Sequence, residues 1–254
     1  EGINKITSEV GVVPNNGNLC TKGRYAYDFV NHPDRLEVPM VRSNGNLEKA
    51  SWEKAYEVIS SKIMDIKSKH GDDSIALMGS GRCTNEENYL FQKFARAVIG
   101  TNNIDQSETE CHSPTLIGLK ESLGIGTTTN SIEEISKSDV IFVFGANITE
   151  AHPIIGLEIK KAVRKGSTLI VADTRNIWLK KIAKIYLNLK PGSDICLINA
   201  IINVIIKEKL YDEKFVKGKA KNFENLKKSI FTIEEKKFKD QTGISQSTIK
   251  EVAR

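Results

Sequence analysis

The sequence lacks any apolar run long enough to cross a membrane. Its longest apolar stretches, 140–144 and 195–206, have the lengths of a strand and an amphipathic helix, whereas a membrane-spanning helix needs about 20 apolar residues. Its start also lacks the basic, apolar and small-residue segments of a secretion signal. The four cysteines form no Cys-x-x-Cys pair, which argues against a disulfide framework and a self-contained zinc site. We therefore expect a cytoplasmic protein without membrane insertion.

Clusters of arginine with aromatic residues are missing as well, although basic residues outnumber acidic ones. Lysine and arginine number 37 against 32 acidic residues, a net charge of +5, and the lysines are scattered in pairs as on solvated helix faces. We therefore expect no nucleic-acid partner. A hydrophobic content of 39% and a charged content of 27% are ordinary for a globular chain of 254 residues, which is long enough to bury a sizeable core.

Strands and helices are expected to alternate along most of the sequence. The first 32 residues have the composition of loop around short strands, 101–114 that of a polar loop, and the end of the sequence that of short lysine-rich helices. The alternation predicts an α/β fold whose mainly parallel sheet has helices on both faces. Apolar periodicity and end signals place helices at 52–69 (after Ser51 as N-cap), 84–98, 153–164 and 195–209, and strands at 74–78, 140–144, 168–172 and 185–189.

Three polar segments follow three of the expected strands, at the edge where parallel sheets bind ligands. Glycine lets the backbone approach a phosphate, Asp173 can accept from ribose or base donors, and Arg175 can pair with phosphate. The same residue types are common in turns, and no Gly-x-Gly-x-x-Gly fingerprint of an ordinary NAD site follows Phe144. We favour a nucleotide-bearing ligand over a turn role alone. The candidate residues are Gly145, Asn147, Glu150, His152, Asp173, Thr174, Arg175, Gly192 and Asp194.

Cys111 and His112 are adjacent in the polar segment 101–114. A thiolate there could bind a soft metal or act as a nucleophile, with His112 as the neighbouring proton acceptor. Taken alone, an isolated Cys-His pair is more often an inert cysteine beside a capping histidine. Cys20, taken alone, is likewise more often a small core residue than a ligand.

Longer strings of sequence favour functional roles for these residues, because the strings resemble those of one protein family and occur in the same order along the chain. They resemble the molybdopterin oxidoreductases, specifically the catalytic subunits of formate dehydrogenases, and the similarity runs over essentially the whole sequence. This resemblance implies a partial catalytic subunit with Rossmann-like, mainly parallel sheets flanked by helices. The strings are 18–24 with 27–36, 82–89, 96–103 and 111–115.

The resemblance also implies roles for single residues. Cys111 matches the cysteine or selenocysteine that binds molybdenum or tungsten, and His112 the adjacent residue of proton transfer from formate. Cys20 matches the last of four cysteines that hold a [4Fe–4S] cluster, and Lys22 the lysine between that cluster and a pterin. The three strand-end loops match places that hold a guanine dinucleotide arm of bis-molybdopterin guanine dinucleotide. The implied reaction is the two-electron oxidation of formate to CO2, or its reverse, with an electron-transfer protein as partner.

Parts of the family pattern lie outside this sequence, namely three cluster cysteines before it and a C-terminal pterin-binding domain after it. We expect this piece to need those parts of its subunit and to be inactive alone. Other readings are a molybdopterin enzyme of the nitrate or polysulfide reductase type, a non-catalytic nucleotide-binding module and an NAD-dependent dehydrogenase. The expected domains are 1–32, a remnant of the iron-sulfur domain; 33–106, the first part of an α/β pterin-binding domain; and 107–254, a dinucleotide-binding-like α/β domain carrying Cys111.

Overall fold

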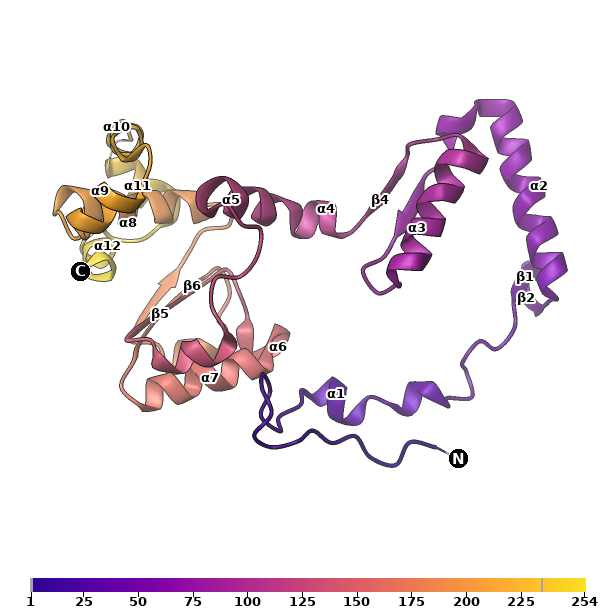
Figure 1. Cartoon of the computed structure of the whole chain (residues 1–254), viewed down its shortest axis with the longest axis horizontal. Coiled ribbons are helices and arrows are strands. Elements are labelled where there is room, and N and C mark those ends of the chain that lie inside the picture. Colours follow the sequence, from indigo (N-terminus) through magenta and orange to yellow (C-terminus); the bar gives the residue numbers. More distant parts are fainter. Residues whose placement is uncertain (1, 234) are drawn as a thin grey trace. The chain divides into compact units, whose positions relative to one another are not determined.

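A computed structural model describes residues 2–233 and 235–254. The chain divides into two compact units, one made mainly of residues 3–27 with 130–254 and the other mainly of residues 28–129. Each unit contains parallel strands with helices between them (Figure 1), which confirms the expected α/β class. The domain boundaries expected from the sequence remain predictions.

The first unit contains a three-stranded parallel sheet. Strands β5 (Val140–Phe144), β6 (Thr168–Asp173) and β7 (Ile185–Asn188) pair in the order β5-β6-β7. Helix α7 (Pro153–Arg164) connects β5 to β6, and helix α8 (Asp194–Lys207) follows β7. These five elements lie within a few residues of their predicted bounds, because continuous apolar strands and a proline in the first helical turn are strong local signals.

Alternate residues of β6 belong to two different hydrophobic cores. Leu169 and Val171 are almost fully buried in a core that includes Ile159 of α7. Ala172 is buried in the second core, with Leu187 of β7 and Leu197 of α8. Side chains of a strand point alternately to its two faces. Helices therefore cover both faces of the sheet, as predicted.

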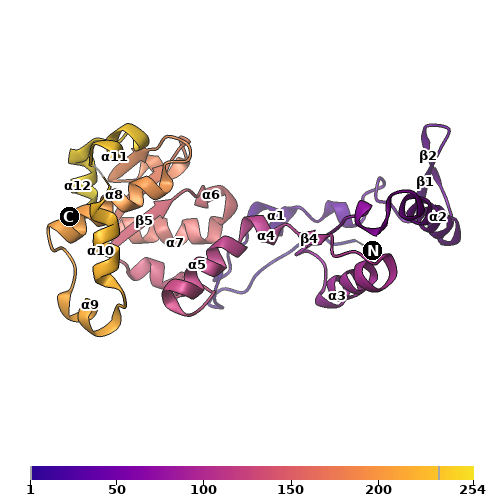
Figure 2. The same cartoon turned by 90° about the horizontal axis from the view of Figure 1, so that it is seen from above.

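Short helices gather around α8 at the end of the chain, as the two views in Figures 1 and 2 show. Lys190 Nζ donates a hydrogen bond of 2.9 Å to the Asp240 carbonyl oxygen, which ties the loop after β7 to this cluster. Arg254 binds the Glu208 carboxylate through two hydrogen bonds of 2.8 and 3.0 Å. The helices that pack on α8 are α10 (Phe223–Phe231), α11 (Glu235–Thr242) and α12 (Gln246–Ala253), and α9 (Glu213–Lys219) precedes α10 in the chain.

The expectation of short strands in the first 32 residues is wrong. The described part of this segment contains helix α1 (Thr21–Tyr25) and the 3-10 turn η1 (Asp28–Val30), and no strand. Asparagine side chains form its turns instead: Asn15 Nδ2 donates to the Asn18 carbonyl at 2.8 Å, and Asn18 Nδ2 to the Asn15 carbonyl at 2.9 Å. Such local bonds compete with strand pairing.

In the second unit, an antiparallel hairpin of β1 (Met40–Ser43) and β2 (Asn46–Lys49) follows η1. Helix α2 (Trp52–His70) follows, and the Ser51 hydroxyl accepts the Lys54 N–H at 3.2 Å, which confirms the predicted N-cap. The strand predicted at 74–78 begins later, because residues 72–74 form the 3-10 turn η2. Strand β3 (Leu77–Gly79) pairs in parallel with β4 (Ile104–Gln106).

The helix predicted at 84–98 changes type. Helix α3 (Asn85–Lys93) continues as a π-helix, η3 (Phe94–Ile99), which buries Ala95 and Ile99. The polar segment 101–114 is not a loop, since it contains β4, α4 (Glu108–Cys111) and the start of α5 (Ser113–Leu123). Elements too short to show a period were missed here. The remaining elements of the chain are η4 (Ile132–Lys137), α6 (Ile148–Ala151) and η5 (Trp178–Lys181).

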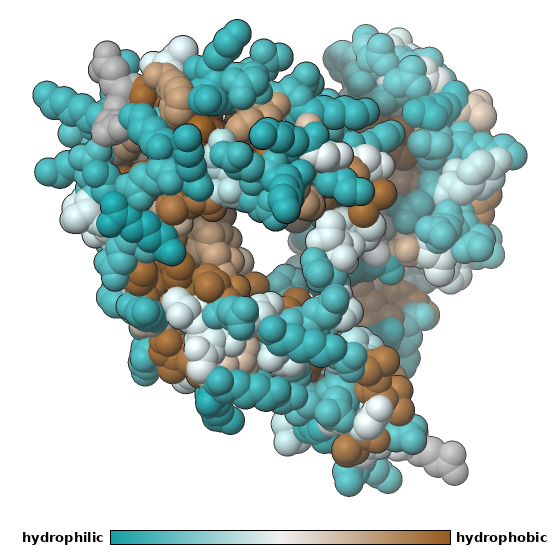
Figure 3. All heavy atoms as spheres, turned by 60° about the vertical axis from the view of Figure 1, so that its left-hand side comes forward, coloured by the Kyte–Doolittle hydropathy of each residue, from teal (hydrophilic) through white to brown (hydrophobic). Residues whose placement is uncertain are grey.

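Hydrophobic side chains reach the surface in several places, as Figure 3 shows in brown. In the second unit, an apolar groove of about 740 Å³ lies between α2 and η3. Among the described residues, no helix has the length and apolarity to span a membrane. The residues lining the groove include Tyr56, Ile59, Ile63, Met64, Phe94 and Val98.

Candidate functional site

The three predicted nucleotide loops follow β5, β6 and β7 and meet at one edge of the sheet. The Gly145 N–H donates to the Ala172 carbonyl of β6 at 2.9 Å. A Cβ placed on Gly145 would lie 3.9 Å from Oδ1 of Asp194, the first residue of α8. Gly145 and Gly192 have φ angles of 60° and 77°, the left-handed region that favours glycine. The structure thus brings Gly145, Asp173 and Asp194 to the same sheet edge.

Asp173 is the buried polar group of this edge, with 3% of its surface exposed. Its Oδ1 accepts the Arg175 backbone N–H at 2.8 Å and lies 3.4 Å from Nε of Arg175. Its Oδ2 is buried and has no hydrogen-bond partner among the described residues. A buried carboxylate oxygen without a donor costs free energy. Oδ2 therefore fits a ligand that brings an N–H or O–H donor to it.

Tyr186 is a site residue that sequence reasoning missed. It lies on β7 opposite Val171, and its hydroxyl donates to the Arg175 carbonyl oxygen at 2.5 Å. Burial of the phenol, followed by the negative charge of Asp173, raises the pKa of Tyr186. The available signal was a hydroxyl-bearing aromatic residue on the strand beside β6, but the sequence pattern alone counts such a residue as core.

The other predicted loop residues surround this edge with more exposed side chains. Asn147 precedes α6, and its Oδ1 accepts the Thr149 hydroxyl at 3.3 Å. Glu150 lies in α6, and His152 separates α6 from α7; both are exposed. Thr174 and Arg175 are exposed directly after Asp173, and Gly192 is exposed in the turn before α8. This part of the site can therefore offer charge and hydrogen-bonding groups to a ligand reached from solvent.

Cys111 and His112 belong to the second unit. Cys111 is the last residue of α4, not part of a loop, and its thiol is exposed. His112 joins α4 to α5; its side chain is exposed and its carbonyl accepts the Leu116 N–H at 3.0 Å. The Ser113 hydroxyl donates to the Glu108 carbonyl at 3.2 Å and fixes this junction. The two side chains are accessible to a metal centre or a substrate.

A hollow of about 540 Å³ lies at the carboxyl ends of β3 and β4. Its lining includes Cys83, the Asn88 side chain of α3, and Glu108 and Thr109 of α4, the helix that ends at Cys111. Gly81 allows this arrangement, because a Cβ there would overlap the Glu108 carboxylate. The hollow is a polar surface beside the predicted metal ligand.

Cys20 and Lys22 lie in the first unit, at the start of α1. Cys20 is half-buried, and its Sγ accepts the Gly23 N–H at 3.3 Å as the N-cap of the helix. Lys22 is exposed. Among the described residues, no group of three His, Cys, Asp or Glu side chains is placed to hold a metal ion. Any iron-sulfur cluster would need further ligands besides Cys20.

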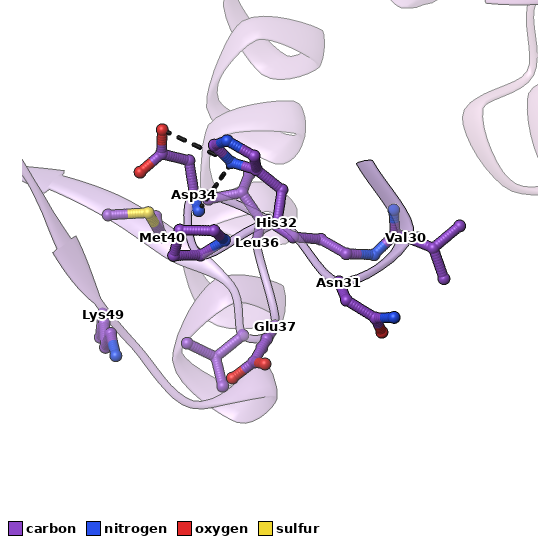
Figure 4. Close-up of a pocket in the computed structure, with 11 residues that line it drawn as sticks. Val30, Asn31, His32, Asp34, Leu36, Glu37, Met40 and Lys49 are labelled. Atoms are coloured by element: carbon purple, nitrogen blue, oxygen red, sulfur yellow. Dashed lines mark hydrogen bonds and ion pairs between the residues drawn. The ribbon is translucent and has the colours of Figure 1, made fainter. Parts of the chain in front are cut away.

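A separate hollow of about 440 Å³ lies in the second unit between residues 30–40 and Lys49 (Figure 4). His32 and Asp34 point toward one another there: His32 Nδ1 accepts the Asp34 backbone N–H at 3.2 Å and lies 3.7 Å from the Asp34 carboxylate. We assign no chemistry to this hollow.

Comparisons with known proteins point to one family. Residues 35–241 match the family model described as molybdopterin oxidoreductase. The chain is 42% identical over 94% of its length to the alpha subunit of F420-dependent formate dehydrogenase 1 of Methanococcus maripaludis, and 43% identical over 94% to formate dehydrogenase H of Escherichia coli. Acetylene hydratase from Pelobacter acetylenicus has a similar structure over 92% of the chain, with a TM-score of 0.73 and 26% identity. The chain covers 35%, 34% and 32% of these three proteins.

Proposed function

We propose, from the premise that this chain belongs to the molybdopterin oxidoreductase family, that it is part of a formate dehydrogenase catalytic subunit. The reaction is the two-electron oxidation of formate to CO2, or its reverse. The observation that carries the proposal is the exposed Cys111-His112 pair in a chain that is 42% and 43% identical to two formate dehydrogenases. A histidine directly after the predicted metal ligand favours formate over nitrate or polysulfide as substrate.

The first unit supplies a binding edge for one guanine dinucleotide arm of bis-molybdopterin guanine dinucleotide. Guanine carries two neighbouring N–H donors on one edge, and the unpartnered Oδ2 of Asp173 is an acceptor suited to them. Gly145 and Gly192 let the backbone approach a phosphate, and the exposed Arg175 can pair with it. Asn147, Glu150, His152, Thr174 and Asp194 complete the proposed contacts.

The second unit supplies the residues nearest the reaction. The Cys111 thiolate is a soft donor that suits molybdenum or tungsten in a sulfur environment. When bound, the metal-pterin group supplies a two-electron acceptor for formate oxidation. His112 accepts the proton that formate releases, because an imidazole is basic enough to do so near neutral pH. Its exposed side chain leaves it free to pass the proton to solvent.

In the complete subunit, further groups would carry the electrons away. Cys20 would contribute one ligand of a [4Fe–4S] cluster, and Lys22 would lie between this cluster and a pterin, provided that the remaining cysteines come from other parts of the subunit. Relatives of this chain are named as alpha subunits, and we propose an electron-transfer protein or subunit as partner. All four thiols are free, which suits a reducing compartment, and we place the protein in the cytoplasm.

The test uses the complete gene product, expressed anaerobically with molybdate or tungstate. Metal and iron content are measured, and formate oxidation is assayed with a viologen acceptor for the wild type, Cys111→Ala and Cys83→Ala. Cys83 is a matched control because it is also an exposed cysteine of the second unit. We expect formate oxidation to be lost in Cys111→Ala and kept in Cys83→Ala. Metal-loaded wild-type protein without formate activity would contradict the proposal.

A further inference from the structure

We propose that Tyr186 is a positioning residue for the Asp173 carboxylate, through which it sets the preference of the sheet edge for guanine. This inference rests on the proposed nucleotide site and adds a residue to it. Tyr186 acts through the Arg175 backbone and need not touch the ligand. Three observations support it: the reach of its hydroxyl, the turn that this hydroxyl holds, and the contacts that hold its ring.

The Tyr186 hydroxyl spans the gap between two strands. Tyr186 pairs with Val171, so its backbone lies two residues before the end of β6. Its hydroxyl nevertheless reaches past that end, to 2.5 Å from the Arg175 carbonyl oxygen and 3.5 Å from the Asp173 carbonyl oxygen. The Tyr186 side chain, which comes from β7, therefore holds the loop that follows β6.

The loop held by this hydroxyl determines which carboxylate oxygen is free. The Arg175 carbonyl oxygen also accepts the Ile177 N–H at 3.0 Å. This one oxygen therefore accepts two hydrogen bonds, from Ile177 and from the Tyr186 hydroxyl. The backbone N–H of the same residue donates to Asp173 Oδ1 at 2.8 Å. Because Oδ1 is engaged by this turn, Oδ2 is the buried carboxylate oxygen that lacks a hydrogen-bond partner among the described residues.

Lys180 holds the ring and the loop together. Its Nζ lies 4.7 Å from the centroid of the Tyr186 ring and donates to Asn176 Oδ1 at 2.8 Å. A cation over an aromatic ring is attracted by it. A phenol is protonated, and therefore a donor, throughout the neutral range, and burial raises the pKa of Tyr186 further. The arrangement is thus fixed before any ligand arrives.

The test measures GDP and ADP binding by calorimetry to the cofactor-free complete gene product. The variants are Tyr186→Phe, which keeps the ring and removes the hydroxyl, and Asp173→Asn. The second variant shows whether the measured GDP binding takes place at the Asp173 site. Tyr211→Phe is the matched control, since the Tyr211 ring packs on Phe223 in the same unit. We expect Tyr186→Phe to weaken GDP binding about fivefold to tenfold, as loss of one positioned hydrogen bond would, and to leave ADP binding and the thermal midpoint nearly unchanged.

The outcomes separate the two proposals. GDP affinity unchanged in Tyr186→Phe but lost in Asp173→Asn would overturn the role of Tyr186 and leave the nucleotide site intact. Equal losses of GDP and ADP binding, together with a lower thermal midpoint, would show a merely structural role and overturn positioning. Wild-type protein without preference for GDP would overturn the guanine site and the role of Tyr186 together.

Discussion

Asp173 binds the Arg175 backbone through one carboxylate oxygen, at 2.8 Å, while its other oxygen is buried without a partner among the described residues. The unpaired oxygen lowers the stability of the fold in the absence of a ligand, and a ligand that donates a hydrogen bond to it would remove this cost. The relationship explains why a turn-forming aspartate can also be a ligand group. It leads directly to the first prediction.

Asp173→Asn is expected to raise the free energy of unfolding by about 1 kcal/mol, since a neutral amide loses less hydration on burial than a carboxylate does. The same change should abolish the preference for GDP over ADP. Urea unfolding and calorimetry of the cofactor-free protein measure the two effects. Thr174→Ala, at an exposed neighbouring position, is the control and should leave unfolding nearly unchanged. A less stable Asp173→Asn protein would contradict the inference that the buried, unpaired carboxylate oxygen destabilises the fold.

His112→Gln is expected to lower the formate turnover number about 100-fold or more with unchanged metal content, because a proton acceptor contributes about that factor. His112 is exposed, so the variant should fold normally. His70→Gln, at the end of α2, is the matched control and should keep full turnover. The assay compares turnover and metal content of all three proteins. A variant with wild-type turnover would exclude His112 as the proton acceptor.

Gly100→Ala and Gly118→Ala should change stability in opposite directions. Gly100 has a φ angle of 92°, and a Cβ there would lie 2.5 Å from Oδ2 of Asp72, so we expect a loss of about 1–2 kcal/mol. Gly118 lies inside α5, where a Cβ meets nothing within 4 Å, so alanine should stabilise the helix by up to about 1 kcal/mol. Chemical denaturation checks both signs, and equal effects would contradict the geometry at Gly100.

Leu187→Ala is expected to cost about 2–5 kcal/mol of unfolding free energy, because Leu187 is fully buried in the core between β7 and α8. Ile195→Ala is the control, since its side chain is 77% exposed and should shift stability by less than about 0.5 kcal/mol. Denaturant midpoints at constant m-value provide the comparison. A tolerated Leu187→Ala would show that this core can collapse around the lost volume.

Glu208→Gln should lower the thermal stability of the protein near neutral pH and leave it unchanged in acid. The hydrogen bond from Arg254 is the main cause that lowers the pKa of Glu208 below 4.5. The stabilisation from a lowered carboxyl pKa is present above the unfolded value and is lost as the pH falls through the folded value. Thermal midpoints of wild type and variant should therefore converge as the pH falls through the lowered pKa of Glu208. Glu251→Gln, an exposed change on α12, should show no such convergence.

The sheet of the first unit could be predicted because its signals are local and redundant. Val140–Phe144 is a continuous apolar strand, and Pro153 opens the following helix within its first turn. The strand ends then follow from the parallel pairing, which places Gly145 and Asp173 at the same edge. The position of these loops was therefore readable from the sequence, although their ligand remains a prediction.

Other features depend on contacts that no local pattern records. Strand β4 has only three residues, too few to show alternation, and exists because Leu77 pairs with Ile104. The π-helix η3 has the same apolar composition as an ordinary helical continuation of α3. The role of Tyr186 depends on a bond between residues 11 positions apart, which sequence spacing alone cannot indicate.

The two-stranded sheet of β3 and β4 has consequences for how the protein behaves at high concentration. Two parallel strands are too few to be stable alone, and each has an edge that is not paired within this sheet. The groove between α2 and η3 adds exposed side chains such as Met64 and Val98, which are 69% and 63% exposed. Open strand edges beside an apolar surface promote self-association. The molar mass determined by light scattering should therefore rise with concentration, and a charge introduced at Val98 should reduce this rise.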